Sequence, residues 1–227
     1  MKYIIVGLGS FGSSLGEKLT ALGHEVIGLD CDMAKVDLYK ERLSHTIRID
    51  ATDEITVSGL PLRDTDVVIV AIGEDPGASI MATALFKNLR AKRLISRAVN
   101  SLHEKVLQAI GVDEIVHPEE ETAERWAKKL CMTDVVDSFD LGGDFSIIEV
   151  KVPEAMVGKR IEEIGFRKNY NLLVLTTIVR REVATEVGKS RKENEVHGVA
   201  GPNDLLHDEH ILVLFGSKQD LQQFTNR

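Results

Sequence analysis

The residues whose types and spacing most clearly suit ligand binding form a glycine-rich turn near the start of the chain. The apolar run Lys2–Val6 leads into Gly7, Gly9 and Gly12, and a second apolar run ends on Asp30. In this pattern the first glycine permits a tight turn, the second lets the backbone approach a phosphate, and the third lets a helix pack closely on the strand. The phosphate binds at the helix N-terminus, and the carboxylate suits ribose hydroxyls but repels a 2′-phosphate. The spacing therefore predicts binding of a nucleotide that lacks a 2′-phosphate.

Other polar residues follow the ends of later apolar runs. The segment 50–52 follows the third predicted strand, Gly73 and Glu74 follow the fourth, and Arg97 ends the fifth. Because the carboxyl ends of parallel strands border one crevice, we expect these residues at the same edge, where an arginine could pair with phosphates. The structural alternatives are a helix cap for Asp50 and Thr52, a turn for Gly73 and a surface ion pair for Arg97. For the glycines the alternative is a degenerate Rossmann turn that binds no nucleotide. The candidate nucleotide-binding residues are Gly7, Gly9, Ser10, Phe11, Gly12, Asp30, Cys31, Asp50, Ala51, Thr52, Ile72, Gly73, Glu74 and Arg97.

These side chains need a sheet to bring them together. Short apolar runs alternate with helical periodicity, and the nearly continuous apolar run at 66–72 is typical of a strand buried on both faces of a parallel sheet. The alternation predicts an α/β fold with a Rossmann-like doubly wound parallel sheet. The expected strands are 2–6, 25–30, 46–50, 66–72, 93–97 and 114–117.

A second domain is predicted after the first. Pro118 starts a helix expected over 118–132, and its acidic first turn suits the helix dipole. We expect a Rossmann-type domain over 1–136, which includes this crossover helix, and a small α+β domain over 137–227. The stretch 189–203 has the composition of a turn-rich insertion. The expected elements of the second domain are strands at 145–152, 172–179 and 211–215, and helices at 160–164 and from 218.

Composition excludes several classes of function. The formal net charge of −8 argues against a nucleic-acid binder, because phosphate neutralisation needs clustered lysine and arginine. Cys31 and Cys131 form no metal or redox spacing, which indicates a reducing compartment, and Cys31 is either a pocket residue or a small filler. No apolar run approaches the roughly 18 residues that a membrane span needs. We therefore expect a cytoplasmic protein.

Residues for catalysis are poorly placed. The seven histidines lie in turns, at strand ends, on a helix or in the second domain, and the sequence holds neither a serine–histidine–aspartate arrangement nor a metal signature. A dehydrogenase needs a proton donor or acceptor beside its cofactor. We therefore expect a binding protein and no enzyme. The alternatives are a small NAD-dependent oxidoreductase and a free-standing nucleotide or redox sensor.

A resemblance to the RCK (regulator of potassium conductance) family rests on the segments 4–30, 50–52 and 71–73, the residues 117–119 and the trailing small domain. More closely, the whole chain resembles the cytosolic regulatory subunits of Ktr and Trk potassium-uptake systems. The resemblance implies a Rossmann domain followed by a small α+β RCK C-terminal domain. It also implies a homo-oligomer, usually an octameric ring, that binds ATP, ADP, NAD or NADH. Such a ring switches an integral-membrane potassium transporter subunit and reaches the inner face of the cell membrane through that partner.

The same resemblance gives roles to single residues. The turn glycines cradle phosphates, Asp30 holds the ribose, the segment 50–52 borders the adenine end, and Arg97 meets further phosphate oxygens. Ser10 stands where Ktr-type members often carry an arginine that reaches a γ-phosphate, so strict discrimination between ATP and ADP is not implied. Glu119 matches a position where related subunits hold an activating divalent or monovalent cation between protomers, although electrostatics at a helix start explains it equally well.

In some relatives the small C-terminal domain dimerises and binds cyclic di-AMP between protomers. The corresponding segment of this chain holds Ile161, Ile164, Arg167, Asn171 and Leu172. An apolar core and a surface arginine are the structural alternatives for these residues. The insertion at 189–203 looks longer than the usual hairpin of that family.

Overall fold

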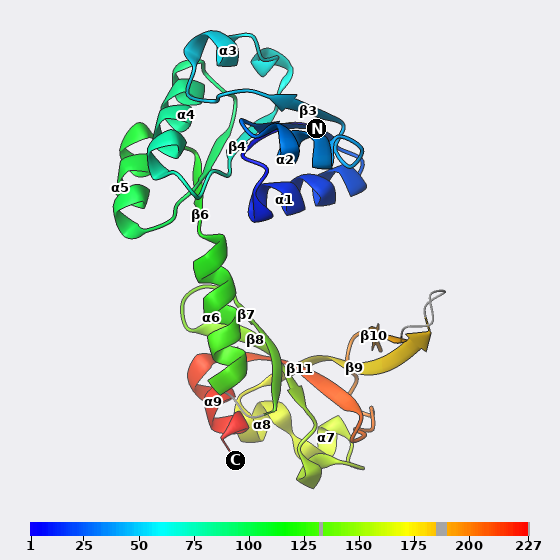
Figure 1. Ribbon diagram of the computed structural model, residues 1–227. Helices are drawn as coiled ribbons and strands as arrows, with labels where there is room; N and C mark the ends of the chain where they lie inside the picture. The colour runs from blue at the N-terminus through cyan, green and yellow to red at the C-terminus, as the bar shows by residue number, and fades with distance from the viewer. Residues whose placement is uncertain (132–133, 185–189, 227) are drawn as a thin grey trace. The chain divides into compact units, whose positions relative to one another are not determined.

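The computed structural model describes residues 1–131, 134–184 and 190–226, and Figure 1 shows their elements. The chain divides into two compact units, Met1–Glu120 and Glu121–Arg227. This division falls inside helix α6 (Pro118–Cys131), upstream of the residue at which we expected the first domain to end. None of the described helices is long and apolar enough to cross a membrane.

In the first unit, the described strands form a six-stranded parallel sheet in the order β3-β2-β1-β4-β5-β6. This order confirms the Rossmann-like doubly wound fold. Because β1 pairs with both β2 and β4, the strand order reverses beside β1, and such a switch point leaves a crevice at the carboxyl ends of the strands. The strands are β1 (Lys2–Val6), β2 (Glu25–Asp30), β3 (His45–Arg48), β4 (Val67–Val70), β5 (Leu94–Arg97) and β6 (Glu114–Val116).

Helices cover both faces of this sheet (Figure 1). Successive strand residues point to opposite faces, so Ile4 packs with Phe86 of α4, while Ile5 packs on the other face with Leu15 of α1. Burying each such side chain stabilises the fold by about 1.5–3 kcal/mol. The two layers therefore hold the strand ends, and the loops that leave them, in fixed positions. The helices are α1 (Ser10–Ala21), α2 (Met33–Tyr39), α3 (Glu54–Ser58), α4 (Pro76–Asn88) and α5 (Ser101–Ile110), with a 3₁₀ turn η1 (Leu62–Asp64).

The second unit holds an antiparallel sheet, whose described strands run in the order β10-β9-β11-β8-β7. The α+β prediction is thereby confirmed. Phe224 anchors the last helix, because its ring lies 5.9 Å from that of Phe166 and 5.2 Å from that of Tyr170, centroid to centroid. The strands are β7 (Val135–Asp140), β8 (Phe145–Lys151), β9 (Leu173–Ala184), β10 (Ser190–Val196) and β11 (His210–Ser217), and the helical elements are η2 (Glu154–Met156), α7 (Ile161–Ile164), α8 (Phe166–Tyr170) and α9 (Lys218–Thr225).

The edge strands of this sheet differ from the sequence prediction. The expected turn-rich insertion was wrong for residues 190–196, which form β10 and pair with β9 in antiparallel register; residue 189 lies outside the described residues. At the opposite edge, β7 occupies a segment where no strand was expected. An edge strand covers little core and often carries charged residues that discourage pairing with other chains. Such a strand therefore lacks the apolar alternation by which strands are recognised.

Candidate functional site

A cleft of about 410 Å³ opens where the strand order reverses, at the carboxyl edge of the parallel sheet. Pockets of this size take small ligands. The loops after β1, β2, β3 and β4 and the end of β5 supply its walls. All predicted residues of the site are described, and Gly12 alone among them stays off the lining. The predicted residues along the cleft are Gly7, Gly9, Ser10, Phe11, Asp30, Cys31, Asp50, Ala51, Thr52, Ile72, Gly73, Glu74, Arg97 and Glu119.

The glycine turn carries the chain from β1 into α1. Gly7 has a φ of +96°, a left-handed conformation that residues with a Cβ avoid, and its N–H donates to the carbonyl oxygen of Leu29 at 2.7 Å. A Cβ on Gly12 would overlap the carbonyl oxygen of Gly7, well inside the 3.0 Å that real Cβ contacts keep. Both glycines thus serve the fold, since one bends the chain and the other brings α1 down onto β1.

Gly9 is a glycine for a different reason. Its φ of −71° and ψ of −172° suit any residue, and no described atom beyond Gly9 and its two chain neighbours lies within 4 Å of the place that a Cβ would take. Neither packing nor backbone strain therefore requires a glycine here. Gly9 is also the N-cap of α1, and no side chain among the described residues caps that helix. The free amides and the open space beside them fit a bound phosphate.

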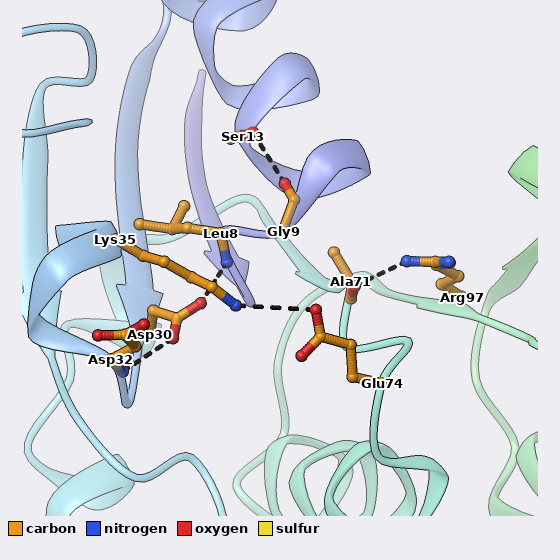
Figure 2. A network of polar contacts seen from close by, with 9 residues as sticks. All are labelled: Leu8, Gly9, Ser13, Asp30, Asp32, Lys35, Ala71, Glu74 and Arg97. Atoms are coloured by element: carbon orange, nitrogen blue, oxygen red, sulfur yellow. Dashed lines mark hydrogen bonds and ion pairs between the residues drawn. The ribbon is translucent and has the colours of Figure 1, made fainter. Parts of the chain in front are cut away.

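Asp30 ties the glycine turn to the end of β2, as Figure 2 shows. Its Oδ2 accepts a hydrogen bond from the N–H of Leu8 at 2.7 Å, and its Oδ1 accepts one from the N–H of Asp32 at 2.9 Å. The residue is only 9% exposed. Each oxygen of an ionised carboxylate keeps a second lone pair, so the group can still accept hydrogen bonds from ligand hydroxyls. Asp30 thus shapes the turn and presents acceptors along the cleft.

The side chain of Asp50 holds the turn after β3. Its Oδ1 accepts hydrogen bonds from the hydroxyl of Thr52 at 2.7 Å and from the N–H of Thr52 at 2.9 Å. Both bonds favour the ionised form and keep the pKa of Asp50 below its ordinary value. The helix-cap alternative for these residues is wrong, because the N-cap of α3 is Asp53. The pair instead forms a polar rim of the cleft.

Arg97 forms the wall on the β5 side of the cleft. Its guanidinium lies against Gly73, where any Cβ would overlap it, and its Nη1 approaches the carbonyl oxygen of Ala71 at 3.5 Å (Figure 2). Its Nη2 donates to Glu119 at the start of α6. The side chain is 16% exposed, and its Nε has no hydrogen-bond partner among the described residues. A phosphate that approaches Arg97 therefore competes with Glu119.

Lys35 is a cationic residue of the cleft that the sequence reasoning missed. It lies near the start of α2, and its Nζ is 4.0 Å from Oε1 of Glu74. Figure 2 shows the two side chains reaching toward each other, Lys35 from α2 and Glu74 from the loop after β4. Its position soon after Asp30, on the helix that leaves the same strand, was a usable signal. The pairing was invisible in the sequence, because it joins distant segments.

The predicted cation site at Glu119 has no further support. Within the described residues, no three His, Cys, Asp or Glu side chains gather in a way that could hold a metal ion. The carboxylate of Glu119 instead forms an ion pair with Arg97. Cation binding at this position therefore stays a prediction that follows from the resemblance alone.

The residues matched to a cyclic di-AMP site lie in the second unit. Ile164 and Leu172 are buried in its core, and Arg167 is exposed. Asn171 has a positive φ of 56° and donates a hydrogen bond to Oδ2 of Asp220 at 2.8 Å. These contacts agree with the structural alternatives for the apolar residues, and ligand binding at this segment stays a prediction.

The comparison with known protein families matches the first unit. The family model of the TrkA-N domain covers residues 3–118, about half of the chain. The chain belongs to the TrkA-N domain family. The matched region of this TrkA-N protein contains the glycine turn, Asp30 and the strands that border the cleft. The predicted resemblance to Ktr and Trk regulatory subunits is thereby confirmed.

Two relatives match this TrkA-N protein over nearly its whole length. Ktr system potassium uptake protein C of Bacillus subtilis (strain 168) is 34% identical over 226 residues, which cover 100% of this chain and 96% of the relative. Ktr system potassium uptake protein A of the same organism is 30% identical over 225 residues, with 99% and 96% covered. Among solved structures, the crystal structure of the GsuK RCK domain shares the fold, with a TM-score of 0.66 and 17% identity. The match covers 100% of this chain and 48% of the chain in that structure.

Proposed function

We propose that this chain is a nucleotide-binding regulatory subunit of a potassium-uptake system. The observation that carries the proposal is the cleft at the switch point, where open space beside Gly9 meets the uncapped N-terminus of α1 and the acceptors of Asp30. This combination fits a phosphate next to a ribose, which is the core of every adenine nucleotide. The full-length match to relatives named as Ktr system potassium uptake proteins supports the transport role.

The proposed mechanism is a shift between two states of an assembly. A ligand moves such an equilibrium only through a difference in its affinity for the two states. Nucleotides with different phosphate tails contact the cleft differently, so they are expected to favour different arrangements of a homo-oligomeric ring. The ring would pass this change to an integral-membrane potassium transporter subunit at the inner face of the cell membrane.

Catalysis has weaker support than binding. No histidine is found among the described residues that line the cleft. Hydride transfer to a small substrate requires a proton donor or acceptor beside the cofactor. We therefore favour a regulatory subunit over a small NAD-dependent oxidoreductase.

Isothermal titration tests nucleotide binding with the variants Asp30→Asn and Asp32→Asn. Asp30 lines the cleft, whereas Asp32 is exposed, caps α2 and lies off the lining, so it is the matched control. We expect micromolar binding of at least one of ATP, ADP, NAD and NADH, weakened about tenfold or more in Asp30→Asn because a hydrogen bond to a charged group is lost. Circular dichroism checks that each variant is folded. Equal binding by both variants would contradict the site.

Potassium uptake by cells tests the regulatory role. The chain would be expressed together with a Ktr-type membrane subunit in cells that lack their own uptake systems, and Asp30→Asn would serve as the variant that binds nucleotide poorly. We expect uptake to depend on the chain and to change in the variant. A chain that binds nucleotide but leaves uptake unaltered would support the free-standing sensor instead. Light scattering adds a test of assembly, for a monomer would exclude the ring.

A further inference from the structure

The three histidines of the second unit gather at one end of its sheet. The rings of His197 and His210 lie 5.2 Å apart, and those of His207 and His210 lie 4.9 Å apart, centroid to centroid. Both pairs meet edge to face, at interplanar angles of 78° and 79°. The remaining histidines of the chain belong to the first unit. His210 is thus the central ring of a cluster that contains every histidine of its unit.

His210 occupies a position that faces the core. It starts β11, and alternation along the strand places its side chain on the same face as Leu212 and Leu214, which are both core residues. Only 7% of His210 is exposed, whereas His197 and His207 are exposed. A core position disfavours a charged imidazole, because burial removes water from the ion. Burial therefore lowers the pKa of His210.

One hydrogen bond requires the neutral form of His210. The N–H of His207 donates to Nδ1 of His210 at 3.4 Å, and an imidazole nitrogen accepts a hydrogen bond only when it carries no proton. A proton on Nδ1 would set two donors against each other and break this contact. His197 tolerates a proton better, because its Nδ1 lies 3.1 Å from the hydroxyl of Thr177, which can donate or accept. Protonation thus acts on the cluster through its central ring.

The charged surroundings of His210 act in both directions. Its histidine neighbours lower its pKa, because positive rings in contact repel each other, and the carboxylates beside it raise the pKa. The groups concerned are His207, His197, Glu209 and Asp208. On β9, His210 pairs with Val179, so Arg180, the next residue of that strand, points to the opposite face. On β8, Lys151 pairs with Asp134. Two exposed carboxylates therefore accompany three rings that gain positive charge in acid.

The cluster joins the two ends of the segment 197–210. At its start, the N–H groups of His197 and Ala200 donate to carbonyl oxygens of β9 at 3.0 and 2.9 Å. Near its end, Leu206 is fully buried in the core, and its N–H donates to the carbonyl oxygen of Lys159 at 3.0 Å. The contact between the first and the last residue of the segment therefore closes it as a loop against the second unit.

We propose that His197, His207 and His210 form a proton-operated clasp, which holds the segment 197–210 on the second unit while His210 is neutral and releases it in acid. A buried neutral ring binds a proton more weakly than the same ring in an opened segment, so protons favour the open form. The opening equilibrium should rise as the pH falls below about 6.5, the ordinary pKa of histidine, by up to about tenfold per pH unit. The inference does not depend on nucleotide binding by the first unit.

Hydrogen–deuterium exchange of the full chain, followed by mass spectrometry at about pH 7.5 and about pH 5.5, measures this opening. After correction for the effect of pH on the intrinsic exchange rate, we expect the protection of the amides in 197–210 to fall about threefold to tenfold in acid. Strand β1 of the first unit should keep its protection. Strand β8, in the core of the second sheet, should stay better protected than the segment at both pH values.

The variant His210→Gln keeps a side-chain acceptor but takes up no proton in this range, so the protection of its segment should no longer depend on pH. His207→Gln tests the clasp should the buried substitution disturb the fold. His207 is exposed, and without its positive charge the fall in protection should be smaller than in the wild type. The control is His45→Gln, at an exposed position of β3, which should behave as the wild type does. Circular dichroism checks that each variant is folded.

The outcomes decide between a clasp and its absence. Equal protection of 197–210 at both pH values in the wild type overturns the inference. A fall in acid that is as large in His210→Gln as in the wild type also overturns it, because the protons would then act elsewhere. Equal exchange of the segment and β8 in acid would show that the whole unit unfolds without a separate clasp. Opening of 197–210 ahead of β8, with a pH dependence that His210→Gln removes, supports the inference.

Discussion

Replacing Gly9 and Gly12 by alanine separates the function of the glycine turn from its fold. At Gly12 the new Cβ would overlap the carbonyl oxygen of Gly7 and lie 3.1 Å from the Cβ of Ala71. The carbonyl of Gly7 belongs to the backbone, so no rotamer change relieves this overlap. Overpacking costs typically 1–3 kcal/mol, and we expect Gly12→Ala to lower the free energy of unfolding by about 3 kcal/mol.

Gly9→Ala should behave in the opposite way. Beyond residue 9 and its two chain neighbours, no described atom lies within 4 Å of the new Cβ, and the backbone angles already suit alanine. Stability should stay the same or rise by up to about 1 kcal/mol, because alanine restricts the unfolded chain. The methyl group would fill the space beside the amides of α1. We expect nucleotide affinity to fall by about tenfold or more, since a phosphate could no longer approach the turn.

Urea denaturation followed by circular dichroism gives the two stabilities, and isothermal titration gives the affinities. The reasoning requires a stable Gly9→Ala that binds poorly and a destabilised Gly12→Ala. Wild-type affinity in Gly9→Ala would show that no phosphate approaches this turn. Wild-type stability in Gly12→Ala would refute the packing argument for the third glycine.

Acidification is expected to weaken the second unit through His210. This residue is 7% exposed. Burial is the largest cause that lowers its pKa, and the nearby His207 and His197 lower the pKa further, whereas the carboxylates at 208 and 209 raise it. A histidine whose folded pKa lies below its unfolded value of about 6.5 binds fewer protons when folded. The free energy of unfolding is therefore greatest above about pH 6.5 and falls below it, by at most about 1.4 kcal/mol per pH unit. Urea titrations across this window measure the slope, and a slope that persists in His210→Gln would assign it elsewhere. A second expectation concerns Gly111, which ends α5 with a φ of +81°, whereas Gly59 ends α3 with a φ of −78°. Gly111→Ala should cost about 1 kcal/mol and Gly59→Ala less than about 0.5 kcal/mol, and equal losses in urea denaturation would contradict the backbone argument.

Much of the cleft's lining was predictable because its signals are local. The glycines and the apolar runs on either side of them specify a strand, a turn and a helix within a few residues, and Asp30 follows at the end of the next strand. The rule that parallel strands share a carboxyl edge then brought the segment 50–52, Gly73 and Arg97 to the same cleft. These inferences need only periodicity and the handedness of strand connections.

The sequence prediction was weakest where a residue's partner decides its behaviour. β10 was missed because a polar edge strand has no apolar pattern, and only its pairing with β9 makes it a strand. The role of Asp30 in holding Leu8 depends on the distance between the end of β2 and the glycine turn, which no spacing along the chain reports.

The amino-acid sequence by itself determined the Rossmann fold of the first unit, the α+β class of the second and the location of the cleft. Tertiary structure alone decided which charged side chains pair with one another within that cleft. Lys35 and Arg97 stand as free cations in the sequence, but the strand order places Glu74 and Glu119 beside them. Coulomb energy depends on the separation of charges in space, and that separation exists only once the sheet has brought distant segments together.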